Sequence, residues 1–321
     1  MKSFHRKKIH KGVVDLGKYG WYFLTPFFII FIVFQLYPLL NTLYTSLVFT
    51  FKNGRNVVSS PGLSFGNYSN YVFGSAGGGE FWQAVGVTLC MWLLNFIPQI
   101  LLALLFAAWF TDSMYKLKGV GFYKIILYMP NIITAASIAV LFYNFVSGHG
   151  PIALLAEKMG TTIDVNKGWT SFIIIAFIQF WMWYGNTMLI LISGIMGISP
   201  SYYEAARVDG ASSFQQFKHI TLPLLKPILQ FTLVTSLIGG LQMFDIPYLF
   251  NNGGPVVCIG DTPVQSTRTI VMLIKKYVTP GEAQNYGKAA SYSIMLFIVT
   301  FILSLICCRI TKANNRRTWR Y

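Results

Sequence analysis

The stretch "EAARVDGASSFQQFKHITLPLLKP", Glu204 to Pro227, is a compact polar segment in a chain of which 54% is hydrophobic. Residues 168–203 before it contain no Asp, Glu, Lys or Arg, and after Lys226 no charge follows until Asp245. A soluble domain needs more than the 11% charged residues found here to cover its surface, and long uncharged runs are typical of membrane spans. We therefore expect this segment at a membrane surface, between two spans.

Five stretches of the chain lack charged residues altogether, and a sixth carries only Asp245. Since an α-helix rises 1.5 Å per residue, about 20 residues cross the hydrocarbon core, and each stretch is long enough to span once. The expected fold is an all-α integral membrane protein with six transmembrane helices, the first interrupted near Pro38. The predicted spans are residues 19–51, 81–110, 125–147, 169–194, 223–250 and 289–308.

The distribution of basic residues predicts the topology. If the N-terminus is cytoplasmic, the inner segments are the basic start 1–18, residues 112–124 and 199–226, and the basic tail, and they hold most of the 25 Lys and Arg. This positive-inside bias places both termini in the cytoplasm and residues 52–80 outside as an external loop. It accounts for the net charge of +15 without nucleic acid as a partner. The tail, residues 310–321, either contacts anionic lipid headgroups or only fixes the topology.

Motifs for catalysis and nucleotide binding are missing from the sequence. It contains no G-x-x-x-x-G-K-[ST], H-E-x-x-H or G-x-S-x-G, and its four histidines are scattered, so we expect neither an enzyme nor a metal site. The glycines at 77–79 follow no strand and are expected in a flexible loop. An ion-driven carrier normally keeps ionisable groups within its spans, where this chain has only Asp245. The energy for any transport is therefore expected to come from a partner.

The opening segment has the signals of two short helices joined by a turn. Ser199 precedes Pro200 as a cap precedes the first helical position, and Gly210 stands where a left-handed residue would end the first helix. Ser212 or Ser213 can cap the second helix. Thr221 and Pro223 are expected to begin the next span in the same way. On these grounds alone, the hairpin is either a docking surface or an ordinary loop with good caps.

The spacing of particular residues in this hairpin resembles a known signature. Glu204-Ala-Ala, then Gly210, Ile220 and Leu222-Pro223, match position for position the EAA motif of permease subunits in binding-protein-dependent ABC importers. Phe244 to Pro255, "FDIPYLFNNGGP", is similar to the fifth-span ending and Gly-Gly-Pro loop of the carbohydrate-uptake branch. The likeness covers nearly the whole chain after residue 19. It implies a MetI-like type-1 permease core over 81–309, preceded by one extra N-terminal helix.

The resemblance also implies a function and partners. The chain would be a multi-pass subunit of the bacterial cytoplasmic membrane that imports a sugar or oligosaccharide delivered by an extracytoplasmic binding protein. Its partners would be a second homologous permease subunit and two cytoplasmic ATPase subunits, which bind the ATP, so the chain itself needs no cofactor. A glycerol-phosphate-type solute is an alternative, although it would require Arg or Lys facing the cavity. A secondary carrier is a further, weaker alternative.

The family pattern assigns the contact with the ATPase to the hairpin 199–223. Glu204 would make the ionic contact with an ATPase arginine, and Gly210 would set the turn, since a β-carbon disfavours a positive φ angle. The coupling residues implied are Glu204, Ala205, Ala206, Asp209, Gly210, Leu222 and Pro223.

A substrate path is expected where polar and aromatic residues share one face of a span. In the fourth span Gln179, Trp183 and Asn186 stand at i, i+4 and i+7, and the fifth span repeats this spacing. The alternative is that the residues of the fourth span pack subunits together and that Gly239 and Gly240 of the fifth span serve close helix packing. Asp245 would either bind a hydroxyl pair or cap the loop at 251–254. The path residues predicted are Gln179, Met182, Trp183, Asn186, Ser236, Gly239, Gly240, Met243 and Asp245.

Overall fold

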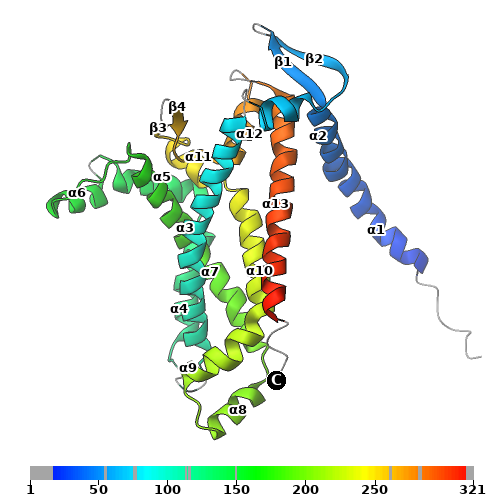
Figure 1. Ribbon diagram of the computed structural model, residues 1–321. Coiled ribbons are helices and arrows are strands. Elements are labelled where there is room, and N and C mark those ends of the chain that lie inside the picture. The colour runs from blue at the N-terminus through cyan, green and yellow to red at the C-terminus, as the bar shows by residue number, and fades with distance from the viewer. Residues whose placement is uncertain are drawn as a thin grey trace, which may run out of the picture.

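The computed structural model describes residues 17–53, 56–74, 78–112, 114, 117–148, 150–259, 262–280 and 284–315. Within these residues, six helical segments are long and apolar enough to cross a membrane, and the mostly helical fold expected from the sequence is confirmed. The basic start 1–16 and the end of the basic tail lie outside the described residues. Figure 1 shows the long helices upright and side by side, with the first helix leaning away from them.

The first span consists of α1 (Gly17–Phe31), the π-helical turn η1 (Ile32–Leu36) and α2 (Tyr37–Leu47). The backbone N–H of Tyr37 bonds the carbonyl of Ile32, one residue before Pro38. Proline has no N–H and its ring clashes with the carbonyl four residues back, so the wider π turn accommodates it. This turn is the interruption expected near Pro38.

The outer segment after the first span has more structure than the external loop predicted over 52–80. Strands β1 (Val48–Asn53) and β2 (Asn56–Leu63) form an antiparallel hairpin. A π-helical turn, η2 (Tyr68–Val72), follows, and then α3 (Gly78–Thr111) begins. The side-chain amide of Asn67 donates to the carbonyls of Ser46 and Val48 and so fixes the hairpin to the end of α2.

The glycines expected in a flexible loop are instead helical where the structure describes them, so that prediction is wrong. Gly78 and Gly79 are the first residues of α3. A β-carbon on Gly78 would lie 2.7 Å from the carbonyl oxygen of Val72. Glycine is needed at this position because the helix begins in contact with the backbone of η2.

The third span is broken, in contrast to the single helix predicted over 125–147. The predicted range is covered by α4 (Val120–Ile132) and α5 (Ala135–Val146), and a short helix, α6 (Pro151–Lys158), follows. The segment long and apolar enough to cross a membrane here is Ala135–Lys158. Thr134 has extended backbone angles, and its hydroxyl accepts the N–H of Ser137, so it is the N-cap of a new helix. Figure 1 shows α5 and α6 turning away from the upright helices.

The fourth span is a single helix, α7 (Gly168–Met196), and the fifth is not. Here α10 (Leu222–Leu241) ends before the predicted residue 250, and a short helix, α11 (Asp245–Asn251), follows after a break. The outer surface then carries a second hairpin and one more short helix before the last span. These elements are β3 (Val256–Ile259), β4 (Thr262–Gln265), α12 (Ile270–Val278) and α13 (Tyr286–Asn315).

Small residues allow the long helices to pack closely. A β-carbon on Gly185 of α7 would lie 2.4 Å from the carbonyl oxygen of Leu127, so the backbones of α7 and α4 are in contact there. The buried apolar side chains form three clusters, one centred on α3 and α13, one on α7 with α5 and α11, and one on the inner ends of α3 and α7. Helices α3, α7 and α10 also line a cavity.

Candidate functional site

A cavity of 420 Å³, called the inner cavity below, lies between α3, α7, α10 and the start of α11. All nine residues predicted for a substrate path line it, although they come from three separate helices and the break between two of them. The structure therefore brings the predicted residues together, while their role in transport stays a prediction. The lining residues are Trp92, Asn95, Gln99, Ala135, Gln179, Met182, Trp183, Asn186, Thr187, Ile190, Thr232, Thr235, Ser236, Gly239, Gly240, Gln242, Met243, Phe244, Asp245 and Ile246.

The wall formed by α7 presents an indole and two amides to this inner cavity. Trp183 is 47% exposed, whereas Gln179 and Met182 beside it are buried. Asn186 is half-buried one turn further along the helix. An indole face between amide groups can bind a ligand that has both C–H faces and hydroxyl edges.

The two glycines of α10 have different surroundings. A β-carbon on Gly240 would lie 2.1 Å from Cδ1 of Trp92, whereas one on Gly239 would meet no atom within 4 Å. The indole N–H of Trp92 donates to the hydroxyl of Ser236 at 3.1 Å. Close helix packing, the alternative reading of this pair, therefore describes Gly240, while Gly239 adjoins open space.

The wall formed by α3 was missed by the sequence analysis. Trp92, Asn95 and Gln99 stand at i, i+3 and i+7, so the periodicity used for α7 and α10 would have identified them had it been applied to residues 81–110. The side-chain amide of Gln99 donates to the hydroxyl of Thr187 at 2.7 Å and joins α3 to α7. The other polar lining residues missed are Thr187, Thr232, Thr235 and Gln242.

Asp245 does not cap the loop at 251–254, so that alternative is wrong. It is the first residue of α11 and is exposed. The loop is held by Asn251 and Thr267, whose side chains both donate to the carbonyl of Gly254. Asp245 lies where a carboxylate interacts favourably with the helix N-terminus, and it is the only charged residue among the described lining residues of the inner cavity.

The polar hairpin has the predicted helix, glycine turn and helix. Its first helix, α8 (Pro200–Val208), follows Ser199, whose hydroxyl bonds that of Ser201 and caps no backbone N–H. Gly210 has φ +75° and makes the left-handed turn. Ser212 caps the second helix, α9 (Ser213–Gln216), through a reciprocal capping box with Gln215.

Thr221 does not cap the fifth span, so this part of the prediction is wrong. Helix α9, the π turn η3 (Phe217–Thr221) and α10 are continuous, and the N–H of Leu222 bonds the carbonyl of Phe217 just before Pro223. The π turn accommodates this proline as η1 accommodates Pro38. Thr221 instead bonds the hydroxyl of Tyr203 at 2.9 Å and joins α8 to the base of α10.

The tip of this hairpin is exposed. Glu204, Ala205, Asp209 and Gly210 are exposed, and Ala206 is half-buried. Within the described part of the chain, Glu204 has neither a side-chain hydrogen bond nor an ion pair. Leu222 and Pro223, at the base, are half-buried. The four exposed residues therefore form an accessible surface, and the two basal residues belong to the junction with α10.

Comparison with known proteins agrees with this arrangement. Residues 71–320 match the model of the family "Binding-protein-dependent transport system inner membrane component". The chain is 30% identical to the lactose transport system permease protein of Rhizobium radiobacter over 294 residues, which is 89% of this chain and 92% of that protein. It is 29% identical to the trehalose/maltose transport system permease protein of Thermococcus litoralis, over 92% of this chain and 94% of that one.

The fold is also found in a solved structure. One chain of a bacterial alginate ABC transporter, in complex with an alginate pentasaccharide-bound periplasmic protein, superposes with a TM-score of 0.74 at 20% identity, over 94% of this chain and 97% of that chain. Family members are transmembrane subunits without catalytic activity or a cofactor of their own. The chain therefore belongs to the inner-membrane permease components of binding-protein-dependent ABC importers, with the MetI-like fold and a binding protein as partner.

Proposed function

We propose that this permease imports a neutral sugar or oligosaccharide and that the inner cavity is part of its path. The observation that carries the proposal is the lining of this cavity, which combines amides, hydroxyls and aromatic rings with one charged residue, the acid Asp245. Such a lining can exchange hydrogen bonds with sugar hydroxyls and stack on the C–H face of a sugar ring. The named transport substrates of the two relatives, lactose and trehalose or maltose, are of this class.

A glycerol phosphate fits this cavity less well. A phosphate requires Arg or Lys as its partner, and the described lining residues include neither. Lys288, in the first turn of the last span, has its ammonium 3.5 Å from the carboxylate of Glu80, which does not line this cavity. The neutral substrate is therefore favoured over the anionic one.

The hairpin would couple this cavity to two cytoplasmic ATPase subunits, with a second permease subunit completing the path and both termini in the cytoplasm of a bacterium. Glu204 would pair with a cation of the ATPase. Since α9, η3 and α10 are continuous, a displacement of the hairpin would move Ser236 and Gly239 in the cavity wall. The Tyr203–Thr221 bond would make α8 move with this helix.

Uptake by vesicles that contain the complete transporter and its sugar-loaded binding protein tests the proposal. Labelled neutral oligosaccharides should enter with ATP, and labelled glycerol phosphate should not. Trp183→Ala should change the relative uptake of different sugars by about tenfold, because the loss of about 1.4 kcal/mol of sugar stacking on the indole corresponds to a factor of ten. Trp169→Ala is the matched control, since Trp169 is 75% exposed on the same helix and does not line the cavity.

Two results would contradict this function. One is ATP-driven uptake of glycerol phosphate with no uptake of neutral sugars. The other is an equal response of Trp183→Ala and Trp169→Ala across all sugars, which would leave the inner cavity without a part in selectivity.

A further inference from the structure

A second cavity, of 570 Å³, lies at the outer end of α3 beside the β3–β4 hairpin and α12. Unlike the inner cavity, it contains several charged groups. Its described lining residues are Gly79, Glu80, Gln83, Ala84, Val87, Val256, Val264, Gln265, Arg268 and Lys276.

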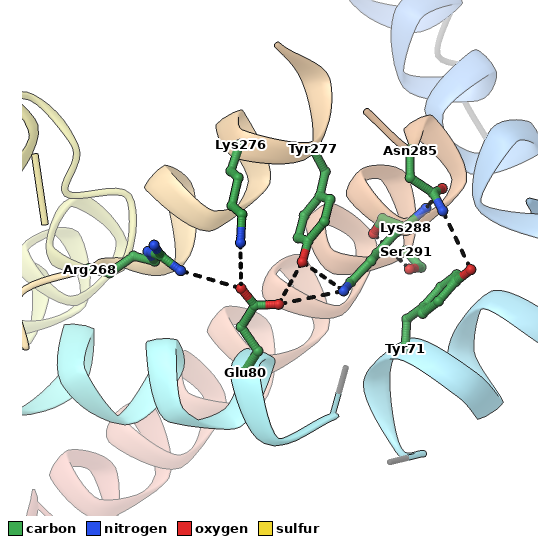
Figure 2. Close-up of polar contacts among 8 residues, drawn as sticks. All are labelled: Tyr71, Glu80, Arg268, Lys276, Tyr277, Asn285, Lys288 and Ser291. Carbon is green, nitrogen blue, oxygen red and sulfur yellow. Dashed lines mark hydrogen bonds and ion pairs between the residues drawn. The ribbon is translucent and has the colours of Figure 1, made fainter. Parts of the chain in front are cut away.

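A cluster of three cations surrounds the carboxylate of Glu80 at this outer cavity (Figure 2), and two of them, Arg268 and Lys276, line it. One oxygen of Glu80, Oε1, lies 3.3 Å from Nη1 of Arg268 and 3.1 Å from Nζ of Lys276. The other, Oε2, lies 3.5 Å from Nζ of Lys288 and accepts the hydroxyl of Tyr277 at 2.6 Å. Among these described groups, one negative charge therefore faces three positive ones.

The three cations are not equally accessible. The side chain of Lys288 is 8% exposed, and its ammonium lies 4.1 Å from the ring centroid of Tyr277 and also close to the rings of Tyr71 and Tyr292. These rings and Glu80 stabilise its charge within the fold. Arg268 and Lys276 are 23% and 32% exposed and line the cavity. Among the described residues, the positive charge in excess of Glu80 is therefore presented to the cavity by Arg268 and Lys276.

The outer cavity is separate from the inner one. Glu80, Gln83 and Val87 of α3 line the outer cavity, whereas Trp92 and Asn95 line the inner cavity on a face rotated by roughly 100° about the helix axis. Thr88 lies on α3 between the residues that line the outer cavity and those that line the inner cavity. Its buried hydroxyl accepts the N–H of Ile270 at 3.0 Å, so the start of α12 is in contact with α3 there. The cluster is thus not a continuation of the proposed sugar path.

We propose that Arg268 and Lys276 bind an acidic side chain of the solute-binding protein when it docks on the outer face. The inference rests on the proposed function, since it concerns the binding protein that delivers the sugar. The carboxylate of Glu80 keeps the two cations in place before docking, and Gln265 orients Arg268 by accepting its Nε–H at 2.5 Å. The remaining N–H groups of Arg268 and Lys276 can then bind an incoming carboxylate.

The position of the outer cavity agrees with a protein partner. Residues of α12 and of the β3–β4 hairpin line the cavity. Figure 1 shows both elements at the same end of the molecule, where a docked protein would contact them. The segment from 256 to 288 also contains the acids Asp261 and Glu282, which lie outside the described residues, so the charge balance given above is that of the described groups. Charge complementarity favours an acidic partner surface, because a basic one would meet Arg268 and Lys276 as like charges.

The test is the Kd of the purified, sugar-loaded binding protein for the complete transporter in nanodiscs, measured at low and high salt. Lys276→Gln should raise the low-salt Kd by roughly fivefold and reduce its salt dependence, because one partner of the incoming acid is lost. Glu80→Gln should lower the Kd, because the amide oxygen can still accept hydrogen bonds from Arg268 and Lys276, while the negative charge that competes with the incoming acid is removed. Lys158→Gln is the matched control: it removes an exposed cation from α6, outside the cluster, and should leave the Kd unchanged.

The opposite signs distinguish docking from a purely structural role. If Lys276→Gln and Glu80→Gln both weaken binding, or if Lys276→Gln leaves the Kd and its salt dependence unchanged, the inference is wrong. Should Glu80→Gln fail to assemble, Lys276→Arg provides a second test: it keeps the charge, so the Kd and its salt dependence should stay close to those of the wild type, in contrast to Lys276→Gln. Competition by free galacturonate against the binding protein would assign the site to a small acid and overturn the inference. If the binding protein fails to bind even the wild type, the proposed function fails with it.

Discussion

Two glutamates at opposite ends of the molecule differ in almost every respect. Glu204 is exposed in the hairpin and has neither a side-chain hydrogen bond nor an ion pair in the described part of the chain. Glu80, at the outer end of α3, is half-buried and contacts three cations and a tyrosine hydroxyl. A carboxylate in the first setting contributes little to folding and is available to a partner, whereas one in the second joins separate elements of the fold.

Tyr277 illustrates how the outer cluster is maintained. Burial raises the pKa of its hydroxyl, and the hydrogen bond to the carboxylate of Glu80 raises it further. The phenol therefore stays protonated and donates at any physiological pH. In the described part of the hairpin, no side chain bonds the carboxylate of Glu204, and the hydroxyl of the adjacent Tyr203 bonds Thr221 instead. The surface around Glu204 can therefore change partners without a cost to the fold.

The largest expected effect is on stability at the outer cluster. Glu80→Ala should lower the free energy of unfolding by about 3 kcal/mol, because three cations lose the carboxylate that they share. Thermal unfolding of the purified protein measures this. The matched variant Glu204→Ala should change it by less than about 0.5 kcal/mol. Equal losses for the two variants would remove the distinction between them.

The cavity wall between these two ends offers a matched pair of glycines. Gly240→Ala should cost about 2 kcal/mol, because its β-carbon would overlap the indole of Trp92. Gly239→Ala adds a methyl group to open space and should be neutral or stabilising by up to about 1 kcal/mol. The same unfolding assay checks both variants, and a larger loss for Gly239→Ala would contradict the packing described here.

A smaller effect, on transport alone, is expected at the hairpin. Glu204→Lys should reduce ATP-driven uptake at least tenfold, equivalent to about 1.4 kcal/mol, by placing a cation opposite the expected cation of the ATPase. Its unfolding temperature should match that of the wild type. Glu157→Lys, at an exposed site on α6, reverses a charge away from the hairpin and should retain uptake. Normal uptake by Glu204→Lys would leave the hairpin as a well-capped loop.

The smallest effect should come from the turn of the hairpin. Gly210→Ala places a β-carbon at φ +75° and should destabilise the turn by about 1 kcal/mol. Hydrogen exchange at the hairpin amides should become about fivefold faster. Gly197→Ala is the control, because Gly197 has a negative φ at the end of α7. Unchanged exchange in Gly210→Ala would show that the hairpin does not depend on this conformation.

Features set by local chemistry could be predicted from the sequence. The six apolar runs predict six spans because length and hydropathy decide insertion. Gly210 was identified, and the helix cap was narrowed to Ser212 or Ser213, of which Ser212 is the cap, because a left-handed turn and a helix cap each depend on a few neighbouring residues. The polar faces of α7 and α10 were found for the same reason, since residues three and four apart share a helix face.

Features set by distant contacts could not be predicted. Arg268 and Lys288 reach Glu80 from 188 and 208 positions away, so no local pattern connects them. The break at Thr134 lies in an uncharged run, where hydropathy does not distinguish one continuous helix from two. Thr221 resembled a cap, but the π turn before Pro223 kept the helix continuous and left its hydroxyl free for Tyr203.

That π turn also sets the rotational phase of the cavity wall. A turn of this kind contains one residue more than an α-helical turn, and one residue corresponds to roughly 100° of rotation about the helix axis. Deleting a single residue from Phe217–Thr221 would therefore turn the faces of Ser236 and Gly239 by about a quarter of a circle. Helix α8, the turn at Gly210 and α9 would keep their own sequence, yet they would act on a wall that no longer faces the cavity.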